Sequence, residues 1–298
     1  MTAATPREDR PAAAVLVMAA AVFLFTLIDT SAKWLIMAGL PALHVVLSRY
    51  VGAFLTALVV FVARGGLGAF RSHRPWIQLI RALALLGSTI FNFMALKYLP
   101  ITLTIAMFFA IPIVTTILSI PVLGEKVGLR RFMAVVIGFI GVLVIVQPWG
   151  AEFHWAIFLS VGALSSASVY FVLTRLLAGT DNNATSQLWS SGVATLCLLP
   201  IAFTGMVWPD DAWTLFVFLF IGFIGGVSHI LATLAYRLAP AKTVAPVIYV
   251  QVIYATAVGY LVFDTLPTVW TALGAAIIIA SGLYIWQRER VRLGDLKG

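Results

Sequence analysis

Charged residues and cysteine are scarce in this sequence. Only 10% of its 298 residues are charged, whereas soluble domains ordinarily carry about 25%. The single cysteine, Cys197, excludes an intrachain disulfide and a cysteine-rich metal site. Hydrophobic residues make up 62% of the chain and the mean hydropathy is +1.04. We therefore expect an all-α integral membrane protein whose main partner is the lipid bilayer.

Signatures of catalysis and metal binding are also missing. The sequence contains no HExxH, no GxSxG and no phosphate-binding loop of the Walker type, and its four histidines do not cluster. The net charge of +8 does not indicate nucleic acid, because the basic residues gather at the ends of apolar runs. We expect no catalytic residue, no metal, no cofactor and no nucleic-acid partner. A membrane enzyme or a scaffold is the alternative from a different class.

Apolar runs of about twenty residues, enough to cross the hydrocarbon core as a helix, alternate with short polar breaks. They predict ten transmembrane helices, at 12–37, 42–63, 76–98, 101–123, 131–147, 154–177, 185–204, 213–238, 243–263 and 268–287. The connections are too short for a separate soluble domain. We expect two domains of five spans each, 1–148 and 149–298.

The positions of lysine and arginine predict the orientation. With the N-terminus inside, nearly all of the 19 lysines and arginines, Arg81 among them, fall in cytoplasmic breaks or helix ends. Lys33 and Lys97 fall on the opposite side, and Arg49 lies within the second span. This bias predicts a multi-pass protein of the inner (cytoplasmic) membrane with both termini in the cytoplasm.

One phrase recurs 140 positions apart, as ALKYLP at 95–100 and AYRLAP at 235–240. The shift pairs Lys97 with Arg237 and Pro100 with Pro240. Because each half has an odd number of spans, the second copy must enter the membrane upside down. The sequence therefore predicts two inverted five-helix repeats around a central cavity, an arrangement in which the substrate site lies between the halves.

Two charged residues inside spans have alternative explanations. An acid near a helix centre is costly in a membrane, and Asp29 has Lys33 four residues later. The two side chains pair locally, or the Asp29 carboxylate meets a substrate amine or carries a proton. Arg49 anchors a substrate carboxylate, or it pairs with Asp29 across a helix interface.

Polar and aromatic residues deep in the spans are candidates for the cavity wall. In the eighth span Gly222, Gly226, His229, Thr233 and Tyr236 share one helical face. Gly222 and Gly226 form a GxxxG pair that packs within one chain or between chains, so a monomer is permitted and the oligomeric state stays open. The predicted substrate-binding residues are Asn92, Phe108, Tyr170, Trp189, His229 and Tyr249, with Asp29 and Arg49 as charge partners.

Prolines interrupt two of the apolar spans. Pro112 lies in the fourth span and Pro246 in its counterpart, the ninth. Proline frees a backbone carbonyl and loosens the turn before it, which is useful where a helix bends to gate a pathway. We consider both that these two helices line the substrate route and that the prolines cause simple kinks.

Several segments resemble a known family. FTLIDTSAKWL, the region from ALKYLP through VLGEKVGLRRF, and LATLAYRLAPAKTVAPVIY are similar to the EamA-type, ten-helix branch of the drug/metabolite transporter superfamily. The most specific features are Lys33, the phrase at 97–100, and Leu123-Gly124-Glu125 after the fourth span. The second half departs from this pattern, since 263–265 reads Phe-Asp-Thr, so a role of Glu125 cannot be carried over to Asp264.

The resemblance implies secondary transport of a small-molecule substrate by alternating access. Within the branch the chain is similar to exporters of the YddG kind, which implies export of aromatic and other neutral amino acids or related metabolites. A drug or nucleotide-metabolite carrier of the same fold is the alternative.

Overall fold

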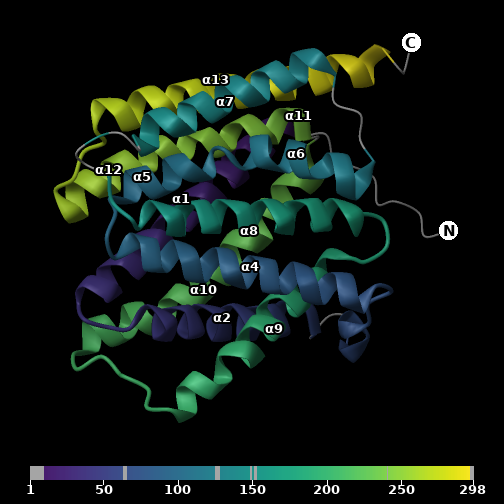
Figure 1. Ribbon diagram of the computed structural model, residues 1–298. Coiled ribbons are helices and arrows are strands. Elements are labelled where there is room, and N and C mark those ends of the chain that lie inside the picture. Colours follow the sequence, from purple (N-terminus) through teal and green to yellow (C-terminus); the bar gives the residue numbers. More distant parts are fainter. Residues whose placement is uncertain are drawn as a thin grey trace.

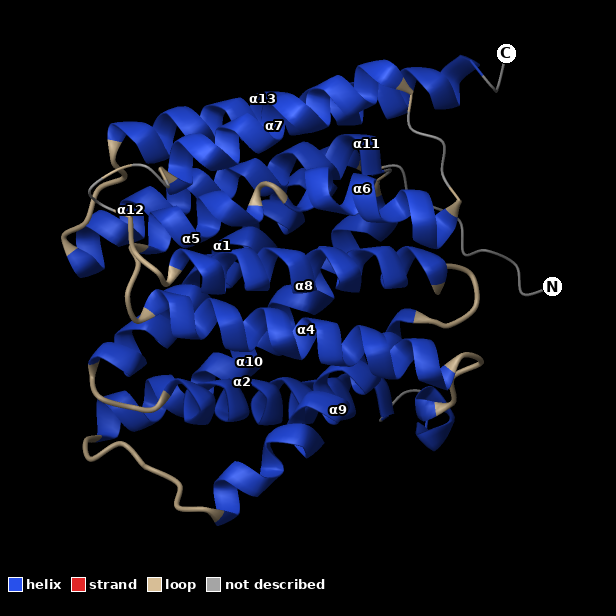
Figure 2. Ribbon diagram, in the orientation of Figure 1, coloured by secondary structure: helices blue, strands red, loops and turns tan. Residues whose placement is uncertain are grey.

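The computed structural model describes residues 10–62, 66–124, 128–147, 150, 153–239 and 241–295, and over these residues it contains helices and loops but no strand (Figure 2). Eight helical segments are long and apolar enough to cross a membrane, and shorter apolar stretches lie at Phe132–Val146 and Val269–Tyr284. The protein is therefore an all-helical membrane protein with ten spans. Glu125 and Pro240, which the sequence analysis singled out, lie outside the described residues.

The first five spans run through α1 to α7 (Figure 1). Their elements are α1 (Pro11–Met37), α2 (Ala42–Ala57) with a π-helical extension η1 (Leu58–Val62), a 3₁₀ turn η2 (Gly66–Phe70), α4 (Pro75–Leu96), α5 (Ile101–Phe108), α6 (Ile111–Leu123) and α7 (Leu129–Val146). Proline in the first turn of α1, α4 and α6 lacks the N–H that a helix start leaves unsatisfied, so it favours these starting points.

The last five spans follow the same plan. Their elements are α8 (Ile157–Leu176), α9 (Asn183–Phe203), α10 (Ala212–Leu238), α11 (Ala241–Val244), the 3₁₀ helix η3 (Ala245–Val250), α12 (Gln251–Phe263) and α13 (Val269–Asp295). Side-chain caps start two of them: Asn182 accepts from the backbone N–H of Thr185, and Asp211 accepts from the backbone of the first turn of α10.

The two halves pack in a symmetric pattern. Equivalent helices meet across the interface, because α2 packs on α9, α5 on α12, and α7 on α13. The first span of each half packs on the third span of the other, as α1 on α10 and α8 on α4. In Figure 1, α7 and α13 lie together at one edge of the bundle, and α2 and α9 lie at the opposite edge. Exchange of the halves leaves this set of contacts unchanged, as expected of a repeat.

The ends of the helices show that the repeat is inverted. The backbone N–H of Arg10, before α1, donates to the carbonyl of Leu238 at the end of α10, which places the two at one end of the bundle. The end of α4 lies instead beside the last turns of α1, where Lys33 reaches the carbonyl of Leu96. Lys97 and Arg237 therefore lie at opposite ends, as the 140-residue shift predicts.

The same shift relates two left-handed helix ends. Gly124 follows α6 with φ 67°, and Asp264 follows α12 with φ 51°. Glycine adopts this conformation freely, and aspartate tolerates it better than most residues do. The departure of the second half from the Leu-Gly-Glu pattern thus preserves the backbone conformation that ends the helix.

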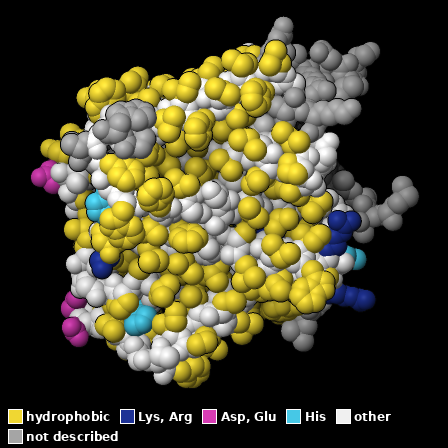
Figure 3. Space-filling view, viewed as in Figure 1, with side chains coloured by type: hydrophobic (Ala, Val, Ile, Leu, Met, Phe, Trp, Pro, Cys, Tyr) yellow, Lys and Arg dark blue, Asp and Glu magenta, His cyan; other side chains and the backbone are white. Residues whose placement is uncertain are grey.

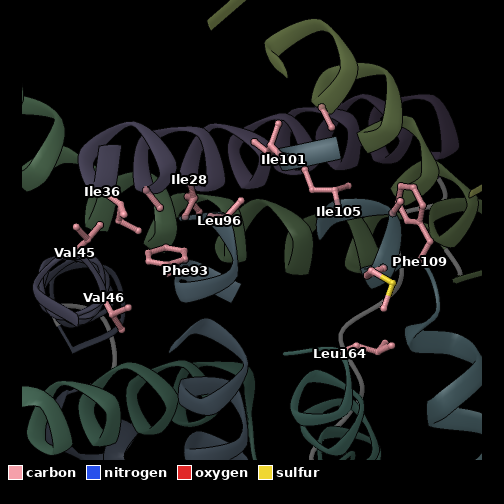
Figure 4. Close-up of a cluster of buried hydrophobic side chains, with 14 of the residues drawn as sticks. Ile28, Ile36, Val45, Val46, Phe93, Leu96, Ile101, Ile105, Phe109 and Leu164 are labelled. Carbon is pink, nitrogen blue, oxygen red and sulfur yellow. The ribbon is translucent and has the colours of Figure 1, made fainter. Parts of the chain in front are cut away.

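Apolar side chains fill the centre and cover the outside. The largest buried cluster joins both halves and includes Ile28, Phe93, Ile105 and Phe109, which Figure 4 shows among the helices they bridge. Figure 3 shows a broad hydrophobic belt between one edge where Lys and Arg side chains gather and an opposite edge that carries Asp and Glu. Such a belt suits contact with lipid, and its polar edges suit the two bilayer surfaces.

The GxxxG pair of α10 is used inside the chain. A Cβ on Gly222 would lie 2.5 Å from Gly52 Cα of α2, and one on Gly226 would lie 2.7 Å from Thr56 Cβ. Ser48 also donates a hydrogen bond to the carbonyl of Phe218. These glycines therefore let α2 and α10 approach closely within one protomer.

Candidate functional site

Two interrupted helices lie at corresponding positions of the two halves. The fourth span, expected as one helix, breaks after Phe108 and restarts as α6 with Pro112 in its first turn. The ninth span, its counterpart, begins as the tight 3₁₀ helix η3 with Pro246 near its start. Paired interruptions of this kind mark substrate sites in inverted-repeat transporters.

A cavity of about 400 Å³ lies between these interruptions. It is also bounded by α8, α10 and α13, so both halves contribute to it. Six aromatic side chains form much of its wall: Phe108, Phe109, Phe171, Tyr236, Tyr249 and Trp286. The described wall contains one charged side chain, Arg175, and no carboxylate. A volume and an apolar lining of this kind are typical of small-molecule sites.

The aromatic wall is ordered by close contacts. The rings of Phe109 and Tyr249 meet edge to face with their centroids 5.5 Å apart. The phenol of Tyr249 lies against Gly282, where an added Cβ would be 2.0 Å from the hydroxyl oxygen. Gly282 therefore makes room for the tyrosine, which holds the two interrupted spans in contact at the cavity.

Two polar atoms at the cavity have no partner among the described residues. They are the Thr115 hydroxyl and the Trp286 indole nitrogen, and both are buried. A buried polar group without a hydrogen bond is costly. These atoms are therefore suited to hydrogen-bond a polar edge of a ligand whose apolar body contacts the aromatic rings.

A second polar centre joins α1, α2 and α4. Asn92 donates from its amide nitrogen to Asp29 Oδ1 at 2.9 Å, and Arg49 donates to the Thr89 hydroxyl at 3.0 Å. Tyr50 shares that hydroxyl at 2.8 Å. Of the two alternatives for Arg49, a direct pair with Asp29 is not formed, because within the described residues no ion pair of 4.0 Å or less joins them. The two charges still interact through space.

Lys33 has a different role from the one predicted. Its ammonium group donates to the carbonyls of Leu96 at 3.1 Å and Leu99 at 2.6 Å, at the end of α4. A cation at this position satisfies carbonyls that the helix end leaves free and complements the helix dipole. Asp29 and Lys33 therefore do not pair with each other. Asp29 contacts Asn92 of α4, and Lys33 contacts the carbonyls at the end of the same helix.

Arg81 forms a buried cluster that the sequence analysis missed. The sequence placed it among topology charges, yet its side chain is only 4% exposed. Its guanidinium donates to five oxygen atoms, those of the Thr174, Tyr170 and Ser190 hydroxyls, the Gln78 side chain and the Ser186 backbone. The only signal in the sequence was spacing, because 78, 81, 89 and 92 share one face of a helix.

Asp181 lies in the loop between α8 and α9 and is connected to the Arg81 cluster through Gln78. It accepts hydrogen bonds from the Ser72 hydroxyl, from the backbone and ring of His73, and from the Gln78 amide. Burial raises the pKa of Asp181, but these hydrogen bonds outweigh that effect and lower the pKa to about 2. The ionised carboxylate thereby ties the start of α4 to the second half of the chain.

Asp181→Asn is expected to lower the melting temperature at neutral pH but not in strong acid. The folded-state pKa of Asp181 lies below its ordinary value of 3.8. The ionised carboxylate therefore contributes fully to the stability of the fold above pH 3.8, and this contribution disappears as the pH falls toward about 2. Thermal melting of both proteins across an acid series measures it. The exposed Asp210→Asn variant should follow the wild type throughout, and a difference that stays constant down to the lowest pH would contradict the expectation.

The predicted lining residues divide among several places. Phe108 and Tyr249 line the 400 Å³ cavity. His229 and Arg49 line a much smaller, water-sized pocket of about 20 Å³ between α2, α9 and α10. Tyr170 accepts from Arg81.

The remaining predicted residues lie apart from both pockets. Asn92 contacts Asp29, and the Trp189 indole donates to the carbonyl of Phe70 at 2.9 Å. The cavity residues that the sequence analysis did not select include Phe109, Phe171 and Trp286.

The chain matches known proteins along nearly its whole length. A family model described as the EamA-like transporter family matches residues 12–147 and again residues 154–287. A riboflavin transporter of Rhizobium johnstonii is 31% identical, with 98% of this chain and 96% of that protein covered. A riboflavin transporter of Vibrio cholerae is 28% identical, with 95% of each covered.

Two further comparisons extend this result. An S-adenosylmethionine uptake transporter of Rickettsia prowazekii is 26% identical over 82% of this chain and 88% of that protein. A solved crystal structure has a TM-score of 0.61 at 19% identity, covers 92% of this chain and 96% of its own, and supports the fold alone. Because the family model matches both halves, and with them most of the sequence, this chain belongs to the EamA-like transporter family.

Proposed function

We propose that this secondary transporter takes up a flat heteroaromatic metabolite of the flavin class through the cavity between its two interrupted helices. The observation that carries this proposal is the aromatic wall of Phe109, Phe171, Tyr249 and Trp286 around a cavity of about 400 Å³. Aromatic rings bind a planar ring system by stacking and by burial of apolar surface. Two relatives named riboflavin transporters support the flavin class. The solute named for a third, S-adenosylmethionine, shares with riboflavin only a heteroaromatic ring system.

Export of amino acids, the function first expected, is the second candidate. The aromatic wall suits an aromatic side chain, and Arg175 offers a cation for a carboxylate. A zwitterion also needs a partner for its ammonium group, however, and the described wall supplies no acid. This difference favours a ligand with a neutral polar ring edge, which the Thr115 hydroxyl and the Trp286 indole can bind.

The distribution of charge and the position of the cavity also support an orientation and a mode of action for this transporter. The excess of basic residues at one end supports a bacterial inner membrane location with both termini in the cytoplasm. The cavity lies toward this end, near Arg175 and Trp286 in the last turns of α8 and α13. At the opposite end α5 packs on α12, where Gly259 lies against Ile101 and Thr102. Alternating access would separate this contact and close the cavity, with the halves 1–148 and 149–298 as the moving units.

Riboflavin binding tests the proposal because its fluorescence reports on the environment of the ring. We expect saturable binding by the purified protein and time-dependent uptake by proteoliposomes. Tyr249→Ala should weaken binding by about threefold to tenfold, the equivalent of one lost aromatic contact. Gly282→Ala should also weaken it, since the added methyl displaces the Tyr249 phenol without removing the ring.

Phe223→Ala is the matched control. Phe223 is an aromatic residue of α10 that is 48% exposed on the outer surface, so its loss should leave riboflavin binding unchanged. Tryptophan, phenylalanine and S-adenosylmethionine serve as competitors. Displacement and transport of tryptophan, with no saturable binding of riboflavin, would reject the flavin class in favour of the amino-acid candidate.

A further inference from the structure

Asp29 lies within the membrane-spanning part of α1 and is only partly buried. Among the described residues its carboxylate accepts one hydrogen bond, from the amide nitrogen of Asn92 at 2.9 Å. Asn92 is 5% exposed, and its own carbonyl oxygen, Oδ1, is buried with no partner among the described residues. An ionisable side chain at such a depth is costly and commonly functional. The buried amide oxygen of Asn92, which accepts no hydrogen bond among the described residues, adds a second and independent cost in folding free energy.

The charged groups around Asp29 leave it unpaired. From α2, Arg49 acts on the carboxylate through space, but its guanidinium is hydrogen-bonded to Thr89. On the same helix, Lys33 is turned to the end of α4. From α10, His229 contacts the ring of Phe25 and lines the small pocket beside Arg49.

Other titratable side chains that the structure describes on the neighbouring helices contact residues other than Asp29. Tyr249 of η3 contacts Phe109, and Tyr254 of α12 contacts Phe23. Arg81 of α4 is bound within its own cluster. Arg49 and Asn92 therefore dominate the polar surroundings of the Asp29 carboxylate.

We infer that Asp29 is the proton-binding site that couples transport to the proton gradient. A metal cation needs several oxygen ligands, whereas Asp29 accepts a hydrogen bond from an amide NH₂ and interacts through space with a guanidinium. Among the described residues it belongs to no group of three or more acidic, histidine or cysteine side chains that could hold a metal ion. A proton needs no such shell, because it forms a covalent O–H bond on the carboxylate. This inference names the coupling ion and rests on the proposed transport function.

Asn92 can bind both states of the carboxyl group. The ionised form accepts from the amide nitrogen, as the structure shows. The protonated form has an O–H to donate, and rotation of the amide brings Oδ1 into position to accept it. The N–H···O⁻ bond is then exchanged for an O–H···O bond, and the buried Oδ1 gains the partner that it lacks. Asn92 is thus a positioning residue for the proton on Asp29.

Helix α1 links this position to the cavity. It packs on α10 and η3, the elements that carry Tyr236 and Tyr249 of the cavity wall. Loss of the negative charge on Asp29 also releases Arg49 from its attraction, at the α2 to α10 contact. A change of charge on one helix therefore reaches both the interface between the halves and the substrate site.

Proteoliposomes with an imposed pH gradient test the coupling, with riboflavin as the probe and pyranine trapped inside as the pH indicator. In the wild type, riboflavin uptake should move protons and should exceed equilibrium when the gradient is applied. Asp29→Asn should lose accumulation against a gradient and the pyranine signal, yet retain exchange of internal for external riboflavin. Asp210→Asn, which alters an exposed acid, should behave as the wild type in both assays.

Infrared difference spectroscopy tests the site without any substrate. The purified protein should gain a protonated-carboxyl band between mildly alkaline and mildly acidic buffer, and Asp29→Asn should lack it. Asn92→Ala should keep the band but shift the pH at which it arises. Absence of the band in the wild type, or its persistence in Asp29→Asn, would overturn the inference. Wild-type riboflavin uptake that ignores the pH gradient would do the same, whereas failure to bind riboflavin with the band intact would reject only the proposed substrate.

Discussion

Replacing Arg81 with methionine is expected to unfold the protein at much lower denaturant concentration than the wild type. The guanidinium is only 4% exposed and satisfies oxygen atoms on α4, α8 and α9, which belong to both halves of the chain. Methionine fills part of the volume but leaves the Tyr170 hydroxyl and the Gln78 side-chain oxygen without the guanidinium that donates to them. Thr174 and Ser190 lose the same donor but keep the hydrogen bonds that their hydroxyls donate to backbone carbonyls. A buried polar group that loses its hydrogen-bond partner typically costs about 1 to 3 kcal/mol, so a loss of at least this size should appear in denaturant unfolding in micelles.

The Arg81→Lys variant tests whether the positive charge alone, without the planar guanidinium, stabilises the cluster. Lysine keeps the positive charge, but its single ammonium cannot reach acceptors arranged around a planar guanidinium. We expect it to recover only a minor part of the lost stability. Arg74→Met, at an exposed position just before α4, is the control and should leave the unfolding midpoint unchanged. Equal midpoints for Arg81→Met and Arg74→Met would show that the cluster contributes nothing to stability.

Replacing Gly222 with valine is expected to prevent normal assembly of the two halves. An added Cβ would lie 2.5 Å from Gly52 Cα, 2.7 Å from the Ser48 carbonyl oxygen and 2.9 Å from the Arg49 carbonyl oxygen. All three are backbone atoms, so relief requires that α2 and α10 move apart. Overpacking of a tight core costs about 1 to 3 kcal/mol for small additions. We expect that much for alanine and a largely aggregated product for valine.

Gly87→Ala provides the matched control for a glycine inside a membrane helix. A Cβ at Gly87 would approach Ser166 no closer than 3.5 Å, an ordinary contact. Alanine also has the higher helix propensity, so this variant should melt at or slightly above the wild-type temperature. Size-exclusion profiles and thermal melting of both variants measure the contrast. Normal elution and melting of Gly222→Val would show that the helices are not in close contact at this point.

The small pocket beside Arg49 connects the Gly222 prediction with the proposed proton site. It is lined by residues of α2, α9 and α10, so it lies on the same interface that Gly222 holds tight. Variants that separate α2 from α10 should therefore disturb the surroundings of Asp29 as well as the stability of the protein. The close contact between α2 and α10 therefore affects both the stability of the protein and the proposed coupling of transport to protons.

Much of the architecture follows from the sequence. Apolar runs of span length predicted the ten helices, and an odd number of spans in each half required an inverted repeat. The 140-residue shift also predicted that Lys97 and Arg237 lie at opposite ends, as they do. These features arise because exposing polar backbone and charged side chains to lipid is costly. Every segment that crosses the membrane must meet this requirement, so apolar runs and polar breaks alternate regularly in the sequence.

Partners of individual polar side chains did not follow from the sequence. Lys33 was expected beside Asp29 but binds carbonyls at the end of α4, and Arg81 was assigned to the membrane surface but lies buried. Local spacing describes neighbours on one helix, whereas these contacts join positions more than sixty residues apart. The hydrophobic periodicity of one span does not indicate which other helix packs against that span.

The sequence by itself determined that this chain crosses the membrane ten times as two related halves, because hydropathy and charge act on each segment independently of the others. Only the tertiary structure decided that Phe109, Tyr249 and Trp286 form one cavity and that Asn92 binds Asp29. Those placements depend on where two helices break and how closely glycines let others approach. Both are properties of pairs of segments, which become defined only when the halves pack together.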